Sequence, residues 1–356
     1  MAMLKQLNQL AGPRSVPRGG IYTLAALNVP TWAARGDRLD ASQHVGRRTA
    51  VGPEHIAVCR ALLPLFAQND AAFGGGGVRE SLRRFLAVSV SEWLGAPAEP
   101  RFRRELCAVA AQMTYLCAFT HFDSNLHHQA QQYYLISLAL AHEAGDRASY
   151  ALGLRGLSVQ AQALGHFRQA DRLATQAVSL GIPHAEPHQQ AFLLGQLALT
   201  RATSGDPKSS ARHLSAAEQR LEVVSSTRAA VGAYHAASLS LHHAAVARGL
   251  RDHQRATRAL QASLRHRPDG ENRSRAITTA HLAEAQLGLG QLDRACYTWS
   301  HFLTHYPQIS SARADDRLQT LMASLRPHQR NRTAAALLDQ ARHLKQQHGR
   351  QGNGRE

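Results

Sequence analysis

A repeat of small side chains, placed at fixed distances from a series of turns, constrains this chain more than any other feature. The turns recur at intervals of 40, 40, 46 and 39 residues, at Asn125, Gly165, Gly205, Arg251 and Gly290. Seven residues before each turn stands a small residue: Ala118, Ser158, Ala198, Ala244 and Ala283. Five residues after each turn stands another: Ala130, Ala170, Ser210, Ala256 and Ala295. Self-similarity at this period is typical of stacked helical hairpins.

The pattern has a steric reason. Two antiparallel helices joined by a tight turn approach closely only where their facing side chains are small, so the residues before and after each turn should face each other. Twelve residues after four of the turns stands a further small residue, and we expect these to face the next pair: Ser137, Ala177, Ala217 and Ser263. Pro268 and Pro307 follow the last two turns and should end the second helix, because proline cannot donate the helical hydrogen bond.

Turn glycines, flanking small residues and a closing proline together resemble the tetratricopeptide repeat. The resemblance covers roughly Arg103 to Tyr306, and we expect a degenerate sixth pair from Ser310 to Gln346 with Arg326-Pro327 as its turn. It implies an all-α fold, a right-handed superhelical solenoid of antiparallel helix pairs. The family period is about 34 residues, and the additional length here falls between repeats.

A second resemblance rests on several short segments: Phe73–Gly76, Val78–Leu94, Phe122–Asp123, Gln131–Tyr134 and Glu143–Asp146. They are similar to the C-terminal repeat region of actinobacterial helix-turn-helix transcriptional regulators. In those proteins a DNA-binding domain precedes a Phe-Gly-Gly-Gly junction and a tetratricopeptide array. Residues 1–52 are too rich in Pro and Gly for three well-formed helices, so we expect that DNA-binding domain to be missing. Direct DNA binding is therefore not supported by the sequence.

These observations divide the chain into four parts. Residues 1–52 are an irregular N-terminal arm or linker, and residues 53–100 a helical N-terminal extension. Residues 101–346 form the tetratricopeptide-like array, and residues 347–356 a disordered tail. No apolar run approaches the roughly 20 residues that span a bilayer. We therefore expect a cytoplasmic protein with no membrane partner.

Charge and cysteine content carry less information. The formal net charge of +16 favours contact with polyanions, but Arg supplies nearly all of it. Because a GC-rich genome also produces such an Arg bias, a basic solvated surface is the alternative. The cysteines have no metal-binding spacing, so we expect buried reduced thiols at Cys59, Cys107, Cys117 and Cys296.

Catalytic motifs are absent from the sequence. The run Gly74–Gly77 lacks the Gly-Lys-Ser/Thr ending of a phosphate loop, so a hinge or a helix N-terminus is expected there. His301 and His305 could share a helix face, but neither a third ligand nor a metalloprotease glutamate accompanies them. We expect no enzyme activity, catalytic residue, metal or cofactor.

The resemblance implies a binding surface instead. In a tetratricopeptide array the first helix of each pair lines the concave groove, and the corresponding residues are Gln112, Tyr115, Phe119, Arg155, Gln162, Phe192, Gln196, His242, Arg248, His281 and Glu284. Polar, arginine and aromatic side chains together can hold a peptide, a small molecule or a protein partner. The alternative is that many of them only pack or face water.

The sequence therefore favours a regulatory protein, transcription-related, whose repeat groove senses a ligand. The rival interpretation is a scaffold that assembles other proteins and has no ligand switch. Whether the chain forms a homodimer stays open at this point.

Overall fold

The computed structural model describes residues 20–29, 32, 50–222 and 234–353. Over these residues the chain is helical and has no strand; Val51 and Ala98 form an isolated bridge. The helices are α2 (Pro53–Phe73), α3 (Gly75–Phe85), α4 (Ser91–Gly95), α5 (Pro100–Asp123), α6 (His127–Ala144), α7 (Arg147–Ala163), α8 (Phe167–Gly181), α9 (Pro187–Thr203), α10 (Pro207–Glu222), α11 (Ala236–Gly249), α12 (His253–Arg265), α13 (Asn272–Gly288), α14 (Leu292–His305), α15 (Ala312–Leu325) and α16 (Arg332–Asn353). A π-helical segment, Leu86–Val90, joins α3 to α4. The all-helical prediction is confirmed.

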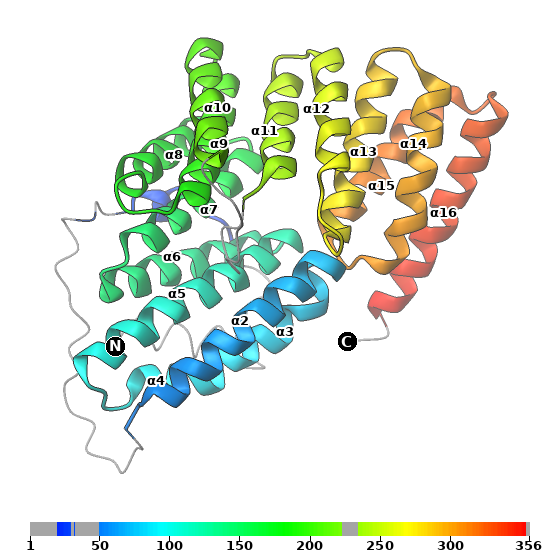
Figure 1. Ribbon diagram of the computed structural model, residues 1–356. Helices are drawn as coiled ribbons and strands as arrows, with labels where there is room; N and C mark the ends of the chain where they lie inside the picture. The colour runs from blue at the N-terminus through cyan, green and yellow to red at the C-terminus, as the bar shows by residue number, and fades with distance from the viewer. Residues whose placement is uncertain (1–19, 30–31, 33–49, 223–233, 354–356) are drawn as a thin grey trace. The chain divides into compact units, whose positions relative to one another are not determined.

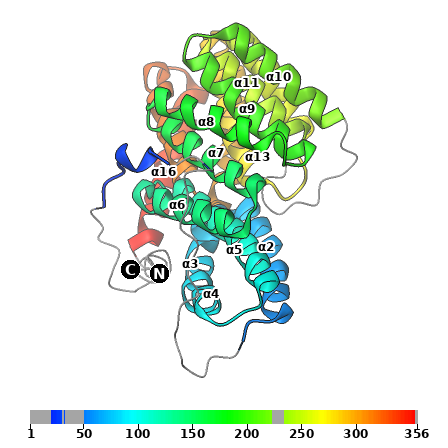
Figure 2. The ribbon, with the colours of Figure 1, turned by 90° about the vertical axis from the view of Figure 1, so that its left-hand side faces the viewer.

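From α5 onward the helices pack in consecutive pairs (Figure 1). The pairs are α5 with α6, α7 with α8, α9 with α10, α11 with α12, α13 with α14, and α15 with α16. A second view shows the hairpins of α5 to α10 end to end (Figure 2). The sixth pair turns at the 3-10 helix Arg326–His328, where the sequence predicts it.

All five predicted turns have left-handed backbone. The φ angle is 80° at Gly165, 83° at Gly205 and 73° at Gly290, and it is 56° at Asn125 and 58° at Arg251. Glycine adopts this conformation without steric penalty, which explains its recurrence at the turns. The chain reverses direction at each of these positions, as the repeat predicts.

The small residues that flank the turns lie where the repeat predicts them. All ten are fully buried. In the α7–α8 pair, Ser158 Oγ donates to the carbonyl oxygen of Ala170 at 2.7 Å, a contact that a larger side chain would prevent. Close approach of the paired helices is therefore confirmed.

The prediction for the next row of small residues is wrong for two of them. Ser137 Oγ donates to Ala111 O at 2.8 Å, and Ser263 Oγ donates to Ala237 O at 2.8 Å. Both acceptors lie on the first helix of the same pair, not on the next pair. The helices of a pair still run side by side two turns beyond their connection, so each hydroxyl meets a carbonyl of its own partner helix.

The described residues divide into two compact units. The first comprises residues 1–68 and 78–234, and the second comprises residues 69–77 and 235–356. Aromatic rings fill both cores, with Tyr133, Tyr134 and Tyr150 fully buried in the first unit and Trp299 and Phe302 in the second. The four cysteines are buried and free, as expected.

The glycine run belongs to the second unit and binds a distant loop. Gly76 N donates to Ser310 O at 3.0 Å, and Ser310 N donates to Phe73 O at 2.7 Å. A Cβ on Gly74, where φ is 88°, would stand 2.5 Å from Ser310 O. Only glycine permits this approach, and α3 begins at Gly75, so the expected helix N-terminus is confirmed.

The two ends of the chain are described only in part. Residues 20–29, 32 and 50–52 represent the predicted irregular arm, and the other residues of that arm lie outside the described ranges. Helix α16 continues to Asn353, beyond the boundary at residue 347 that the sequence analysis sets for the tail.

Candidate functional site on the first helices

The structure places all eleven candidate residues on first helices of the pairs. In the first unit they lie on α5, α7 and α9: Gln112, Tyr115, Phe119, Arg155, Gln162, Phe192 and Gln196. In the second unit they lie on α11 and α13: His242, Arg248, His281 and Glu284. Helix α7 packs against both α5 and α9, so the first helices of that unit form one continuous layer. We call its surface, and the corresponding surface of the second unit, the first-helix face.

Arg155 is the centre of the site in the first unit. Its side chain comes from α7, and the residue is only 8% exposed. The guanidinium carbon lies 3.2 Å from the centroid of the Phe192 ring on α9, which is cation–π geometry. Arg155 Nε also donates to the carbonyl oxygen of Phe192 at 3.2 Å. Arg155 therefore joins α7 to α9.

Aromatic residues surround this cation. The rings of Tyr115 and Tyr134 meet edge to face at 5.6 Å, and the rings of Phe192 and Tyr234 are 5.2 Å apart. Burial lowers the pKa of Arg155, and the neighbouring Tyr115, Tyr234 and Tyr134 oppose that shift. We call these five residues the Arg155 cluster.

No carboxylate balances the charge of Arg155. Among the described residues, no aspartate or glutamate forms an ion pair with it, and its polar neighbours are tyrosine hydroxyls and a carbonyl oxygen. A buried guanidinium is normally paired with an anion, because desolvating an isolated charge is costly. The Arg155 cluster is therefore a place where an anionic group would be stabilised.

The remaining candidates in the first unit have packing roles. Gln196 is 2% exposed, and its Nε2 donates to Ser158 Oγ at 3.1 Å. Gln162 Nε2 donates to Thr203 Oγ1 at 3.3 Å, which joins α7 to α9. Phe119 packs at 6.2 Å from Phe122, and Gln112 is half-buried on α5.

In the second unit three candidate residues meet around one carboxylate. Glu284 on α13 accepts from Arg248 Nη2 on α11 at 3.1 Å, and His281 Nδ1 lies 3.3 Å from the same carboxylate oxygen. Arg317 Nη1 on α15 donates to the other oxygen at 2.9 Å. We call these four residues the Glu284 cluster. His242 lies on α11 too, with its Nδ1 at 3.3 Å from Ser238 O.

The Glu284 cluster carries a net positive charge. Burial alone would raise the pKa of Glu284, but the hydrogen bond and charge of His281 and the charges of Arg317 and Arg248 outweigh it and lower that pKa to about 2. Burial lowers the pKa of His281 to about 4, so this imidazole is neutral at pH 7. Two guanidiniums then share one carboxylate.

Sequence reasoning missed Arg317, Tyr134 and Tyr234. Arg317 lies on the first helix of the sixth pair, so extending the candidate surface to that pair would have found it. Tyr134 lies on the second helix α6, and Tyr234 precedes α11 outside the repeat pattern. No spacing rule points to either tyrosine.

The described residues do not suggest redox, metal or membrane chemistry at these sites. Within the described ranges, no group of three or more His, Cys, Asp or Glu side chains is placed to hold a metal ion. Over the same residues, no helix is both long and apolar enough to cross a bilayer. Both clusters instead combine cations with aromatic or acidic neighbours, an arrangement that binds ligands through charge and ring contacts.

Comparison with known proteins supplies no family assignment. No protein-family model matches the chain, and no curated protein matches it significantly.

Proposed function

We propose that the chain is a cytoplasmic regulatory protein, transcription-related, whose first-helix face binds a peptide, a small molecule or a protein partner. In this proposal the helix pairs stack as a tetratricopeptide-like, right-handed solenoid. The in-phase turns and the small residues buried between paired helices support that arrangement.

The observation that carries the binding role is Arg155. A guanidinium that is 8% exposed, lies against Phe192 and has no carboxylate partner among the described residues keeps its capacity to bind an anion. A ligand that presents a carboxylate or phosphate beside an aromatic or aliphatic group would satisfy both the charge and the ring surface.

Thermal unfolding in the presence of fractionated culture extract tests this role. A ligand raises the melting temperature by mass action, so a low-molecular-mass fraction should stabilise the wild-type protein. If the chain is a scaffold without a ligand switch, only the protein fraction will have this effect. That rival function also uses the first-helix face and therefore shares the observation on Arg155.

The link to transcription needs its own experiment. Electrophoretic mobility shift on promoter fragments near the gene, at low salt, should show a complex if the chain contacts DNA directly. The absence of any shift would exclude direct contact. Regulation would then have to act through a protein partner.

A further inference from the structure

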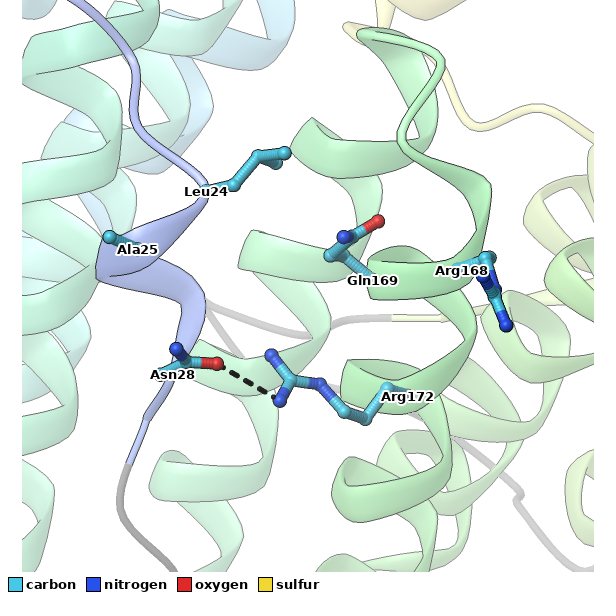
Figure 3. Close-up of a pocket in the computed structure, with 6 residues that line it drawn as sticks. All are labelled: Leu24, Ala25, Asn28, Arg168, Gln169 and Arg172. Carbon is cyan, nitrogen blue, oxygen red and sulfur yellow. Dashed lines mark hydrogen bonds between the residues drawn. The ribbon is translucent and has the colours of Figure 1, made fainter.

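Residues 20–29, which we call the arm segment, lie against the second helices α6 and α8 of the first unit (Figure 3). The segment is extended apart from one 3-10 turn at Ala25–Leu27. It occupies a different surface from the first-helix face. The arm segment therefore shows how this chain binds an extended polypeptide.

Most of the polar contacts are made to the main chain of the arm segment. Gln131 is fully buried; its Oε1 accepts from Thr23 N at 3.1 Å, and its Nε2 donates to Thr23 O at 2.9 Å. This pair of bonds reproduces the way a neighbouring β-strand would bind Thr23. On α8, Arg172 Nη2 donates to Leu27 O at 2.9 Å and Nη1 donates to Asn28 Oδ1 at 3.2 Å.

Two side chains and one glycine give the arm segment its register. Leu27 is fully buried, and the Tyr22 ring stacks on His166 with centroids 5.6 Å apart. A Cβ at Gly20 would overlap the His128 ring at 2.2 Å, so the segment passes this point only with glycine. Ile21 is 77% exposed and contributes no anchor.

The arm segment does not fill its seat completely. A cavity of about 540 Å³ remains between the segment and α8, lined by Leu24, Ala25, Asn28, Arg168, Gln169 and Arg172 (Figure 3). In this region the segment lacks the close packing of a protein interior, which weakens its hold on α8. Its attachment depends on Gln131, Arg172 and the Leu27 and Tyr22 anchors.

We propose that the surface of α6 and α8 is a peptide-binding groove that takes the arm segment of a second copy of this chain in place of its own. Every contact described above involves only the groove and the arm segment, so the same set forms whichever copy supplies the segment. Exchange of an identical element between two copies preserves those contacts. The intramolecular arrangement is favoured by its effective concentration, of millimolar order for a short flexible link. A chain with a defective arm segment loses this competition and has a groove open to another copy.

Complementation between two full-length variants tests the proposal. Leu27→Asp places a charge in the apolar anchor site, which disables the arm segment and leaves the groove intact. Gln131→Ala removes both bonds to Thr23, which disables the groove and leaves the arm segment intact. Fluorescently labelled Leu27→Asp chain is titrated with unlabelled Gln131→Ala chain, and its mass is followed by analytical ultracentrifugation. The matched control titrant is a chain that carries both substitutions.

We expect the labelled chain to gain one partner from the Gln131→Ala titrant, with an apparent affinity at least tenfold tighter than from the doubly substituted titrant. Equal behaviour of the two titrants would overturn the proposal. Because Gln131 is buried, Arg172→Ala serves as a second groove variant at an exposed position, and circular dichroism establishes that every variant is folded. A labelled peptide of residues 20–29 should also bind the Leu27→Asp chain. Peptide binding without association of the chains would identify a groove that a second copy cannot reach, and this result too would overturn the proposal.

Discussion

Replacing Glu284 by glutamine should destabilise the second unit by about 3 kcal/mol at pH 7. The carboxylate is held by Arg248, Arg317 and His281, and its pKa is about 2 in the folded chain against an ordinary value of 4.5. Each pKa unit corresponds to about 1.4 kcal/mol, which gives the estimate. The side chain is 16% exposed, so solvent screening does not reduce this figure to that of a surface pair.

Urea unfolding at pH 7 measures this loss, with Trp299 as the reporter because it is fully buried in the second unit. Trp32 and Trp93 lie in the first unit and are replaced by phenylalanine in all proteins compared. Asp339→Asn is the matched control, since Asp339 and Arg342 form an exposed ion pair that should contribute less than about 1 kcal/mol. Equal losses for the two variants would refute the reasoning.

The dependence on pH has a definite sign. The pKa of Glu284 is depressed on folding, so its stabilising contribution is complete above about pH 4.5 and is lost as the pH falls towards about 2. The difference in unfolding free energy between wild type and Glu284→Gln should therefore be constant from pH 7 to pH 5. A difference that grows on acidification would contradict this account.

Three further predictions concern buried charge and backbone conformation. His281 has its pKa lowered to about 4 from 6.5, so unfolding free energy reported by Trp299 should fall by up to about 3 kcal/mol between pH 6.5 and pH 4, and His281→Gln should remove this slope. Asp70 and Arg273 form a buried ion pair at 3.0 Å; Asp70→Asn should cost about 3–5 kcal/mol in urea unfolding, whereas the double change Asp70→Leu with Arg273→Met should be nearly neutral. Gly165 has φ 80° and open space where a Cβ would stand, so Gly165→Ala should cost about 1–2 kcal/mol and Gly165→Asn less, as seen in melting temperatures.

The fold could be predicted because its determinants are local and steric. A left-handed turn and two small residues at fixed offsets restrict one hairpin, and the same restriction repeats along the chain. The position of Ser137 shows the limit of this reasoning. Spacing predicts that its side chain is buried, but which helix carries its acceptor depends on the length over which two helices stay in contact.

The contacts of the two clusters and of the arm segment depend on distant parts of the chain. Arg248 and Glu284 could be assigned to the right helices, but their pairing with Arg317 depends on the spacing between first helices. Thr23 and Gln131 are 108 residues apart, and Asp70 and Arg273 are 203 apart. The composition of residues 1–52 predicts an irregular arm and gives no indication of the surface that binds it.

The comparison of wild type with Arg155→Met tests the central claim most directly. Replacing a buried charge that has no anionic partner by an apolar residue of similar volume should leave the melting temperature of the ligand-free protein unchanged or raise it. In the stabilising extract fraction, wild type should gain several degrees and Arg155→Met should gain none, because the anion-binding group is gone. If both proteins gain equally, or if the ligand-free variant melts several degrees lower, then Arg155 is a structural residue and the first-helix face is not the binding surface proposed for this chain.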